Sequence, residues 1–413
     1  MTEMIGFFRN LKGNPKTILS VDPLWTLSFN MFAPFATLYM FALGLGDVEI
    51  GTLLSVQMFA NFIMALLGGV VVDKFGRKWT LIVGDILSWS VPVLIWAFSQ
   101  NFWYFLVAAL FNSFSQIAMV SFECNWLDDL EEEKIPNTVN WFHIFWLACT
   151  ASALVSGYFV GLYSVEPVMR VVYLFAFVVM TVRVVILIFR LKETDRGRER
   201  MEATRGKSIL LLVGGYREVF LQIWRTKRMR RLLFLMPMVH IFMMITGTFF
   251  ALYATQDLEI GEHFMAYFPV IRAGVALLFF MFIQTRLGRF DPRHLMGVGL
   301  GLFIVGHILL LIAPPGNIPW LLVYAFVEAW AASLFFPRID ALMFGSIDPT
   351  ERARCRSLIN VVVLAVASPF GILAGFLSDM DRRLPFVLNM LLFICLIYFV
   401  LPKRGEIKHE GNV

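Results

Sequence analysis

The sequence predicts an all-α membrane protein with twelve transmembrane helices, arranged as two pseudo-symmetric bundles of six. Three observations lead to this prediction. Of the 413 residues, 59% are hydrophobic and only 16% are charged, whereas a soluble domain is about half apolar and about a quarter charged. The apolar residues come in blocks of about 20, the length at which a helix crosses a bilayer. A long basic segment in the middle of the chain separates six blocks from the other six.

The predicted spans follow one another with mostly short connections. Residues 1–190 form the first six-helix bundle, 191–231 a cytoplasmic linker, and 232–413 the second bundle. Several spans contain Pro or Gly, which membrane helices tolerate because neighbouring groups satisfy the freed backbone. The twelve ranges are 22–44, 51–72, 79–98, 102–126, 140–163, 168–190, 232–255, 264–285, 295–313, 319–341, 357–378 and 384–402.

Lysine and arginine mark one side of the membrane. The two terminal segments, the linker and alternate loops hold most of the 35 Lys and Arg residues, whereas the opposite loops hold only Arg170, Arg382 and Arg383. Because cytoplasmic loops are enriched in these residues, we expect a multi-pass protein of the cell membrane with both termini in the cytoplasm. The bilayer is its expected surrounding, and this bias explains the net charge of +5 without nucleic-acid binding.

The loop after the second span contains an unusual group of charges and glycines. Residues 69–78 read G-x-x-x-D-x-x-G-R-K. Gly69 allows two helices to approach closely, and Gly76 permits a tight turn of the backbone. Asp73 is placed to pair with Arg77 or Lys78. A plain positive-inside loop needs neither this acid nor the glycines, so we expect a cytoplasmic latch that is remade as the protein changes conformation.

This loop resembles the signature of the major facilitator superfamily, which lies between the same two spans. The resemblance covers the whole chain in architecture but only some ten residues in motif, and the second-half copy, "LLFFMFIQTRLGR", has Thr285 in place of Asp73. It implies the fold of that superfamily and transport by alternating access, with spans 1, 2, 4, 5, 7, 8, 10 and 11 around a central cavity. Drug–proton antiporters of the family carry an Arg in span four and a Gly-Pro motif in span five. "LVAALFNSFSQIAM" and "ASALVSGYFVG" lack them, which weakens that assignment.

Two charged residues lie near the middle of predicted cavity helices. Arg272 belongs to span eight and Glu328 to span ten. A charge at that depth costs about 2.5–3.5 kcal/mol on insertion scales, so each needs a reason to be there. One interpretation is an ion pair that holds the two helices together. The interpretation that we favour is a substrate or proton site.

Further polar residues lie on helices that the resemblance places around the cavity. An isolated amide in a membrane helix often joins two helices, but three polar stripes favour a hydrated cavity. His240 is an alternative proton site or a histidine satisfied by a backbone carbonyl. Asp85 is expected to join the charges of the motif loop, and Arg183 and His307 to serve packing. The binding candidates are Asn30, Gln57, Asn61, Asn112, Gln116 and His240.

An acidic loop, "DDLEEEK" at 128–134, departs from the basic character of its side of the membrane. It corresponds in the repeat to "DPTERARCR" at 348–356. We expect the two to pair when the cytoplasmic mouth is closed, although a solvated charge run is an equal alternative because exposed pairs contribute only about 0–1 kcal/mol. The gate candidates are Asp128, Asp129, Glu131, Arg352, Arg354 and Arg356.

The predicted function is secondary active transport of a small polar or anionic organic solute by a monomer, with proton coupling through Glu328 left open. No metal site is expected because the four cysteines are far apart in the sequence. No cofactor is expected either: "GKS" at 206–208 lacks the glycine that a phosphate-binding loop needs five residues before Gly206, where Met201 stands. The alternative is an exporter of amphipathic drugs or lysolipids. A membrane receptor or enzyme on the same scaffold is a remote third.

Overall fold

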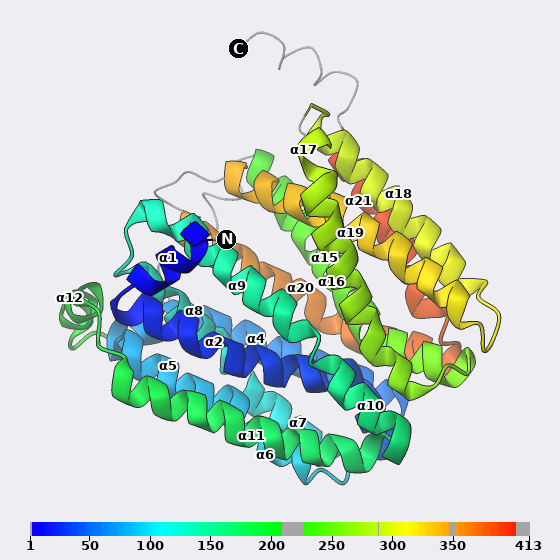
Figure 1. Ribbon diagram of the computed structural model, residues 1–413, viewed down its shortest axis with the longest axis horizontal. Coiled ribbons are helices and arrows are strands. Elements are labelled where there is room, and N and C mark those ends of the chain that lie inside the picture. The colour runs from blue at the N-terminus through cyan, green and yellow to red at the C-terminus, as the bar shows by residue number, and fades with distance from the viewer. Residues whose placement is uncertain (1, 209–226, 288, 347–351, 402–413) are drawn as a thin grey trace. The chain divides into compact units, whose positions relative to one another are not determined.

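The computed structural model describes residues 2–208, 227–287, 289–346 and 352–401. Every regular element within these ranges is a helix (Figure 1). The chain forms two compact units, Met1–Glu218 and Val219–Val413, and their boundary falls inside the segment 191–231. The all-helical fold class that the sequence predicts is confirmed.

The N-terminal unit is built from helices that pack in two groups. Helix α2 packs against α9 and α11, while α4 and α5 both pack against α8. The helices are α1 (Thr2–Asn10), α2 (Gly13–Phe32), the 3-10 helix η1 (Ala33–Phe35), α3 (Ala36–Ala42), α4 (Asp47–Phe75), α5 (Arg77–Asp85), the π-helix η2 (Ile86–Ser90), α6 (Val91–Ala97), α7 (Phe102–Asn112), α8 (Ser115–Leu127), the 3-10 helix η3 (Glu132–Lys134), α9 (Ile135–Thr150), α10 (Ala153–Tyr163), α11 (Val165–Arg190) and α12 (Asp195–Thr204).

Proline explains how two of these spans are interrupted. Pro34 lies in η1, between α2 and α3, and Pro92 is the second residue of α6, which follows the π-helix η2. Because proline has no N–H, the carbonyl four residues earlier loses its helical partner. For Pro92 that carbonyl belongs to Ser88, and it accepts a hydrogen bond of 2.6 Å from Asn112 Nδ2 on α7. A neighbouring side chain thus satisfies the freed backbone group, as the membrane interior requires.

The C-terminal unit repeats the same kind of packing. Helix α18 packs against α19 and α21, α16 against α19, and α15 against α20. Its core includes the fully buried Leu300, Phe335 and Phe393. The helices are α15 (Lys227–Leu252), the π-helix η4 (Tyr253–Asp257), the 3-10 helix η5 (Glu262–Ala266), α16 (Tyr267–Phe282), α17 (Gln284–Leu287), α18 (Pro292–Leu311), α19 (Ile318–Ser346), α20 (Arg352–Met380) and α21 (Leu384–Val400).

The described residues contain ten helical stretches that are long and apolar enough to cross a membrane. They correspond to predicted spans two to eleven. Span twelve is the shorter apolar helix α21, and span one is α2, η1 and α3, interrupted at Pro34. Large apolar side chains point outwards along these helices, for example Phe189, which is 83% exposed, and Val171, which is 66% exposed. Surfaces of this kind face lipid, and the chain is a multi-pass membrane protein.

Candidate functional site

Arg272 and Glu328 form an ion pair inside the C-terminal unit. Arg272 lies on α16 and Glu328 on α19, two helices that pack against each other. The two side chains differ in exposure: 35% of the Arg272 side chain is exposed but only 10% of the Glu328 side chain. The carboxylate is therefore held within the protein, while about a third of the Arg272 side chain is accessible.

Aromatic side chains surround this pair. The Arg272 guanidinium lies 5.9 Å from the centre of the Phe250 ring on α15, a cation–π distance. Tyr324, one turn before Glu328 on α19, packs 5.4 Å from Phe250 and places its hydroxyl beside Arg272. Arg272 Nε is buried and has no hydrogen-bond partner among the described residues. The site therefore combines the Arg272 cation, the Glu328 carboxylate and one N–H donor, Arg272 Nε, that has no acceptor among the described residues.

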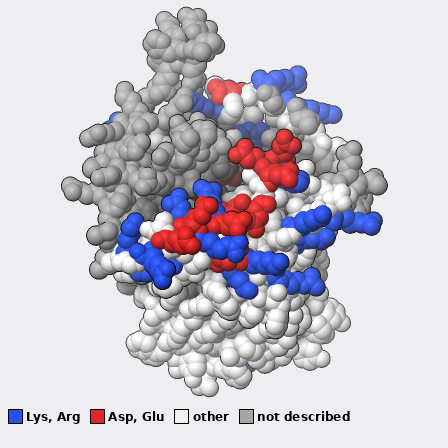
Figure 2. All heavy atoms as spheres, turned by 90° about the vertical axis from the view of Figure 1, so that its left-hand side faces the viewer, with Lys and Arg blue, Asp and Glu red and all other residues white. Residues whose placement is uncertain are grey.

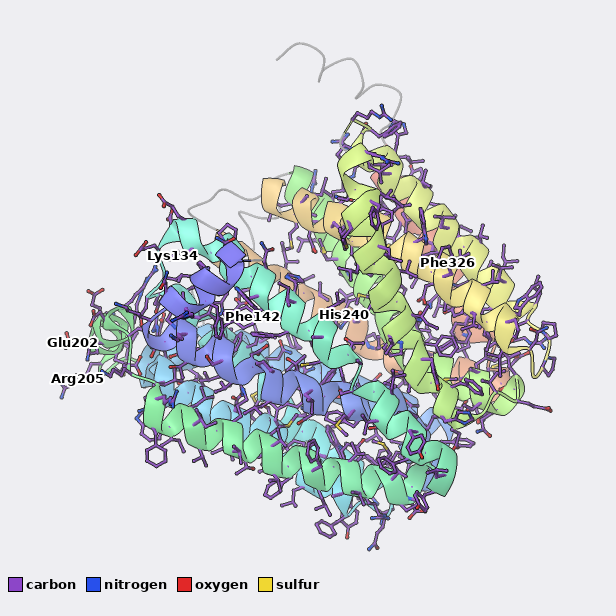
Figure 3. All side chains as sticks on the ribbon, in the orientation of Figure 1. Lys134, Phe142, Glu202, Arg205, His240 and Phe326 are labelled. Atoms are coloured by element: carbon purple, nitrogen blue, oxygen red, sulfur yellow. The ribbon has the colours of Figure 1, made fainter. Side chains whose placement is uncertain are left out.

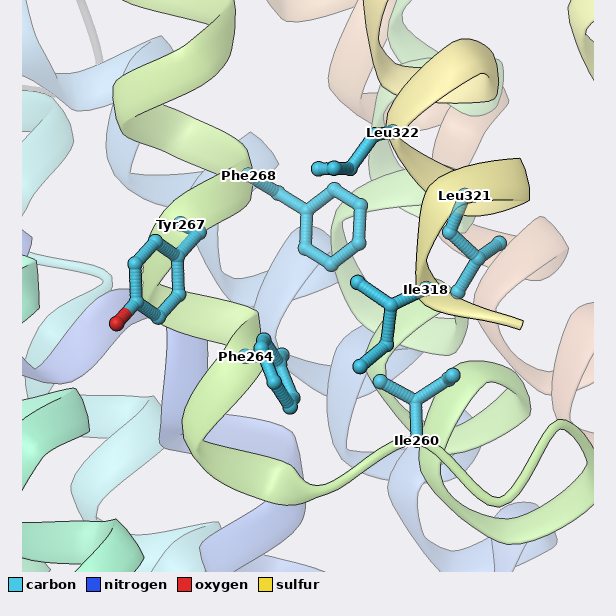
Figure 4. Close-up of a pocket in the computed structure, with 7 residues that line it drawn as sticks. All are labelled: Ile260, Phe264, Tyr267, Phe268, Ile318, Leu321 and Leu322. Carbon is cyan, nitrogen blue, oxygen red and sulfur yellow. The ribbon is translucent and has the colours of Figure 1, made fainter. Parts of the chain in front are cut away.

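An apolar cavity of about 240 Å³ lies next to this site (Figure 4). Its walls come from η5, the first turn of α16 and the first turn of α19, with Phe268 and Leu321 among the lining side chains. Phe268 also packs 4.9 Å from Phe250, so the rings of Phe268 and Phe250 lie between the cavity and the Arg272 guanidinium. This arrangement is suited to a molecule that has an anionic end and an apolar end.

Gln57 and Asn112 are joined to each other in the N-terminal unit. Gln57 Nε2 on α4 donates to Asn112 Oδ1 on α7 over 2.7 Å, and Asn112 in turn donates to the Ser88 carbonyl. This chain connects α4, α7 and η2. Asn112 has a structural task in this conformation, because it satisfies the carbonyl freed by Pro92.

The other polar candidates are spread over both units. Asn30 is buried on α2 and donates 2.8 Å to the Thr26 carbonyl of its own helix. Asn61 Oδ1 on α4 is buried and accepts no hydrogen bond from the described residues. Gln116 is half-buried on α8, and His240 is half-buried on α15, where Figure 3 labels it. Substrate contact by these residues stays a prediction.

The motif loop is a network of buried charges at one end of the N-terminal unit. Arg77, only 4% exposed, pairs with Asp73 over 3.2 Å and with Asp128 over 3.1 Å. The Asp128 side chain is 7% exposed and also accepts from Thr194 Oγ1 over 3.1 Å. Ser121 and Asn125 of α8 both donate to the Arg77 carbonyl. The guanidinium thus joins the loop to the ends of two other helices.

The segment after the sixth span completes this network. Glu193 accepts hydrogen bonds from the backbone N–H groups of Arg77, over 2.8 Å, and Lys78, over 3.0 Å. These are the first N–H groups of α5, where a negative charge is favoured. Gly76 has φ +84°, and a Cβ there would lie 2.6 Å from Glu193 Oε2, so both the turn and the close approach require glycine.

Helix α12 lies against the same loop. Thr204 Oγ1 donates to the Asp73 carbonyl over 3.1 Å, while Glu202 and Arg205 point outwards (Figure 3). Figure 2 shows acidic and basic side chains gathered together on this face, above an uncharged surface. Gly69 lies on α4, where its neighbour Gly68 makes the close contact with Val120 of α8.

We expect Glu193→Ala to destabilise the N-terminal unit by about 1–2 kcal/mol, because the loss of a helix cap costs about 0.5–2 kcal/mol. The matched control is Glu199→Ala, which changes an exposed residue of α12. Thermal unfolding of the two purified variants checks this expectation. Equal unfolding temperatures would contradict a capping role for Glu193.

The predicted gate is only partly described by the structure. Asp128 is engaged with Arg77, and Glu131 pairs with Lys134 over 2.8 Å within its own loop. Partial burial, followed by the negative charge of Asp128, raises the pKa of Asp129 above its ordinary value, and a cationic partner would relieve this. The side chains of Arg352, Arg354 and Arg356 lie outside the described residues, so the gate stays a prediction.

Comparison of the sequence with models of known protein families shows to which family the chain belongs. Residues 27–389 match the model described as the MFS_1 like family, over nearly the whole chain. The chain belongs to the MFS_1 like family. This membership confirms the resemblance to the major facilitator superfamily, and it places the chain among transporters rather than enzymes.

Solved transporter structures share the fold of this MFS_1 like protein. The nucleoside transporter NupG matches with a TM-score of 0.71 at 16% identity, covering 95% of this chain and 100% of that chain. A POT family transporter in complex with 5-aminolevulinic acid matches with a TM-score of 0.70 at 13% identity, covering 94% of both chains. A peptide transporter POT in complex with sulfate gives 0.66 at 15%, covering 93% of this chain and 94% of that chain. No curated protein matches the sequence.

Several residues of this MFS_1 like protein have partners that the sequence analysis did not identify. Glu193 is an acidic residue in a segment rich in Lys and Arg, and this contrast could have identified it from the sequence. Arg338 is 8% exposed and donates to the carbonyls of Ser333 and Leu334. Since Ser333 lies four residues before Pro337, the guanidinium satisfies a carbonyl that the proline leaves free.

One sequence expectation is corrected by the packing of α5 against α11. Asp85 was expected to join the motif loop, but it pairs with Arg183 instead, and both residues are buried. Asp85 lies two turns beyond Arg77 on α5, so it cannot reach the loop, whereas Arg183 faces it from α11. His307, expected to serve packing, is buried and lies 3.3 Å from the amide of Asn389.

Proposed function

We propose that this protein is a secondary active transporter that moves a small organic solute with an anionic group by alternating access. The arrangement of Arg272 carries the proposal: it pairs with Glu328, yet a third of its side chain is exposed and its Nε lacks a partner among the described residues. A purely structural arginine would use its donors, because an unsatisfied buried donor costs about 1–3 kcal/mol. A guanidinium grips a carboxylate or phosphate through two parallel hydrogen bonds.

Membership in a family of transporters and the likeness to transporter structures support this proposal. The neighbours named above include a nucleoside transporter, and POT structures in complex with sulfate and with 5-aminolevulinic acid. We place the protein in the cell membrane as a monomer with both termini in the cytoplasm, on the distribution of Lys and Arg. Residues 1–190 and 232–413 would be its two moving bundles, connected by 191–231.

The direct test is a binding screen followed by a transport assay. Purified protein is heated with nucleosides, short peptides, organic acids and phosphate esters, because a ligand at about 100 times its Kd adds about 2.7 kcal/mol of stability. The compounds that stabilise the protein are then tested for uptake into proteoliposomes under an imposed pH gradient. Binding of an anion without any gradient-driven flux would contradict transport.

We further propose that Glu328 carries the coupling proton. Glu328→Gln should retain exchange of substrate across the membrane but lose accumulation against a gradient, because the variant still holds Arg272 in place but has no carboxylate to protonate. Counterflow and pH-driven uptake measure the two activities separately. Asp379→Asn, which changes an exposed acid on α20, is the control and should retain both. Undiminished accumulation by Glu328→Gln would remove Glu328 from the coupling mechanism.

A second candidate function is export of amphipathic compounds or lysolipids. The apolar cavity beside the Arg272–Glu328 pair is the observation that favours it. The same screen separates the two candidates when it includes alkyl phosphates and cationic drugs. Stabilisation by long-chain compounds, together with outward flux from loaded vesicles, would favour export over uptake of a polar solute.

A further inference from the structure

A buried ion pair inside the N-terminal unit, apart from the motif loop, has a third charged side chain within electrostatic range. Asp85 at the end of α5 and Arg183 on α11 form an ion pair, and they are 5% and 4% exposed. Asp22 on α2 interacts electrostatically with both. We call these three residues the Asp22–Arg183–Asp85 cluster. Neither the motif network nor the Arg272–Glu328 pair includes any of them.

Apolar side chains lie next to these residues along their helices. Val21 and Val184, the neighbours of Asp22 and Arg183 in sequence, belong to one buried core. Ile18, Leu81 and Leu187 complete its surroundings from α2, α5 and α11. Because a charge surrounded by apolar groups is poorly stabilised unless it is paired, the charges in this cluster have to balance one another.

The formal charges of the described groups in this cluster do not sum to zero. The cluster has two carboxylates and one guanidinium, and hence one negative charge too many if both acids are ionised. From α9 the Cys149 thiol interacts with Asp22. From α8 come Glu123 and Cys124, whose electrostatic partners are Asp128 and Arg77 of the motif network. None of these supplies a positive charge.

We propose that the cluster binds one proton, carried by Asp22, and so forms a proton site in the N-terminal unit that is separate from Glu328. Asp85 is held directly by Arg183, whereas Asp22 has a hydrogen bond of 3.3 Å from Thr26 and is only half-buried. Protons from water therefore reach Asp22 more easily than Asp85.

Arg183 supplies the element that makes this site reversible. Its Nε is buried and has no hydrogen-bond partner among the described residues. When Asp22 releases its proton to water, the new carboxylate is attracted to this unused donor. Proton binding would then alter the contact between α2 and α11, the two helices that carry Asp22 and Arg183.

The test is infrared spectroscopy of the full chain in lipid nanodiscs, in a Glu328→Gln background that removes the other proposed proton site. We expect the carbonyl band of a protonated carboxylic acid, and we expect it to disappear on adding Asp22→Asn. It should also disappear on adding Asp85→Asn, because Asp22 alone is then neutralised by Arg183. The control Glu166→Gln, which changes an acid at the other end of α11, should leave the band unchanged.

A double variant tests the proposal even if the single substitutions impair folding. Arg183→Gln with Asp85→Asn leaves Asp22 without a charged neighbour in the cluster, and we expect the band to persist. A band at neutral pH that Asp22→Asn leaves unchanged, or no band at neutral pH in the Glu328→Gln protein, would overturn the proposal. Loss of the band on exchanging potassium for sodium at constant pH would also overturn it, since the site would then take sodium. The outcome is independent of whether Glu328 couples transport.

Discussion

Arg272→Gln should still fold, because Glu328 can take up a proton once its arginine is removed. It should lose at least about 100-fold in affinity for an anionic substrate, since two hydrogen bonds to a charged group are worth about 3 kcal/mol or more. Arg272→Lys should recover only part of this, because an ammonium lacks the planar pair of donors. The measurement is the substrate concentration needed to raise the unfolding temperature. Arg286→Gln, which changes an exposed arginine of α17, is the matched control and should bind normally.

The alternative interpretation of the pair makes a different prediction. If Arg272 and Glu328 only hold α16 and α19 together, removing one leaves a buried unpaired charge, which costs about 3–5 kcal/mol, and removing both restores the protein. The double variant Arg272→Gln with Glu328→Gln separates the two interpretations. Normal transport by this double variant would contradict a substrate site and show that the pair is structural.

Arg77→Ala should have the largest effect among changes to the motif loop. It leaves the Asp128 carboxylate, 7% exposed, with only the exposed Arg196, 3.9 Å away, as a cationic partner. We therefore expect a loss approaching about 3–5 kcal/mol in stability together with slower exchange between conformations. Asp73→Asn should cost at most about 1 kcal/mol, because the Asp73 side chain is 36% exposed. Thermal unfolding and counterflow rates measure the two effects.

Substrate affinity should be nearly unchanged in both variants, because the Arg272–Glu328 pair belongs to the other compact unit. Adding Asp128→Asn to Arg77→Ala should recover part of the lost stability, since no unpaired charge then remains. Lys74→Ala, which removes only a hydrogen bond to the Lys207 carbonyl, is the control. Normal stability and normal exchange in both Arg77→Ala and Asp73→Asn would contradict the latch.

The sequence predicts the fold well because membrane helices are encoded by composition and length. The pairing of Arg272 with Glu328 could also be predicted. A charge inside the membrane is energetically unfavourable, and its partner must lie at the same depth on one of a few helices. Hydrogen bonds to freed carbonyls were not predictable. Asn112 was a binding candidate and Arg338 was not singled out, yet each satisfies a backbone group that a nearby proline leaves without a partner. Recognising this requires the helix packing.

The capping of α5 by Glu193 has a consequence for the biogenesis of this protein. The residue that accepts the hydrogen bond of the Arg77 N–H group lies 116 residues later in the chain. Chains emerge from the ribosome N-terminus first, so the second and third spans leave the ribosome long before their connecting loop can be completed. A nascent chain that ends at Arg190 would contain all six spans of its unit but neither Glu193 nor Thr194. Stable assembly of the first half should therefore begin only when the segment after the sixth span has been synthesised.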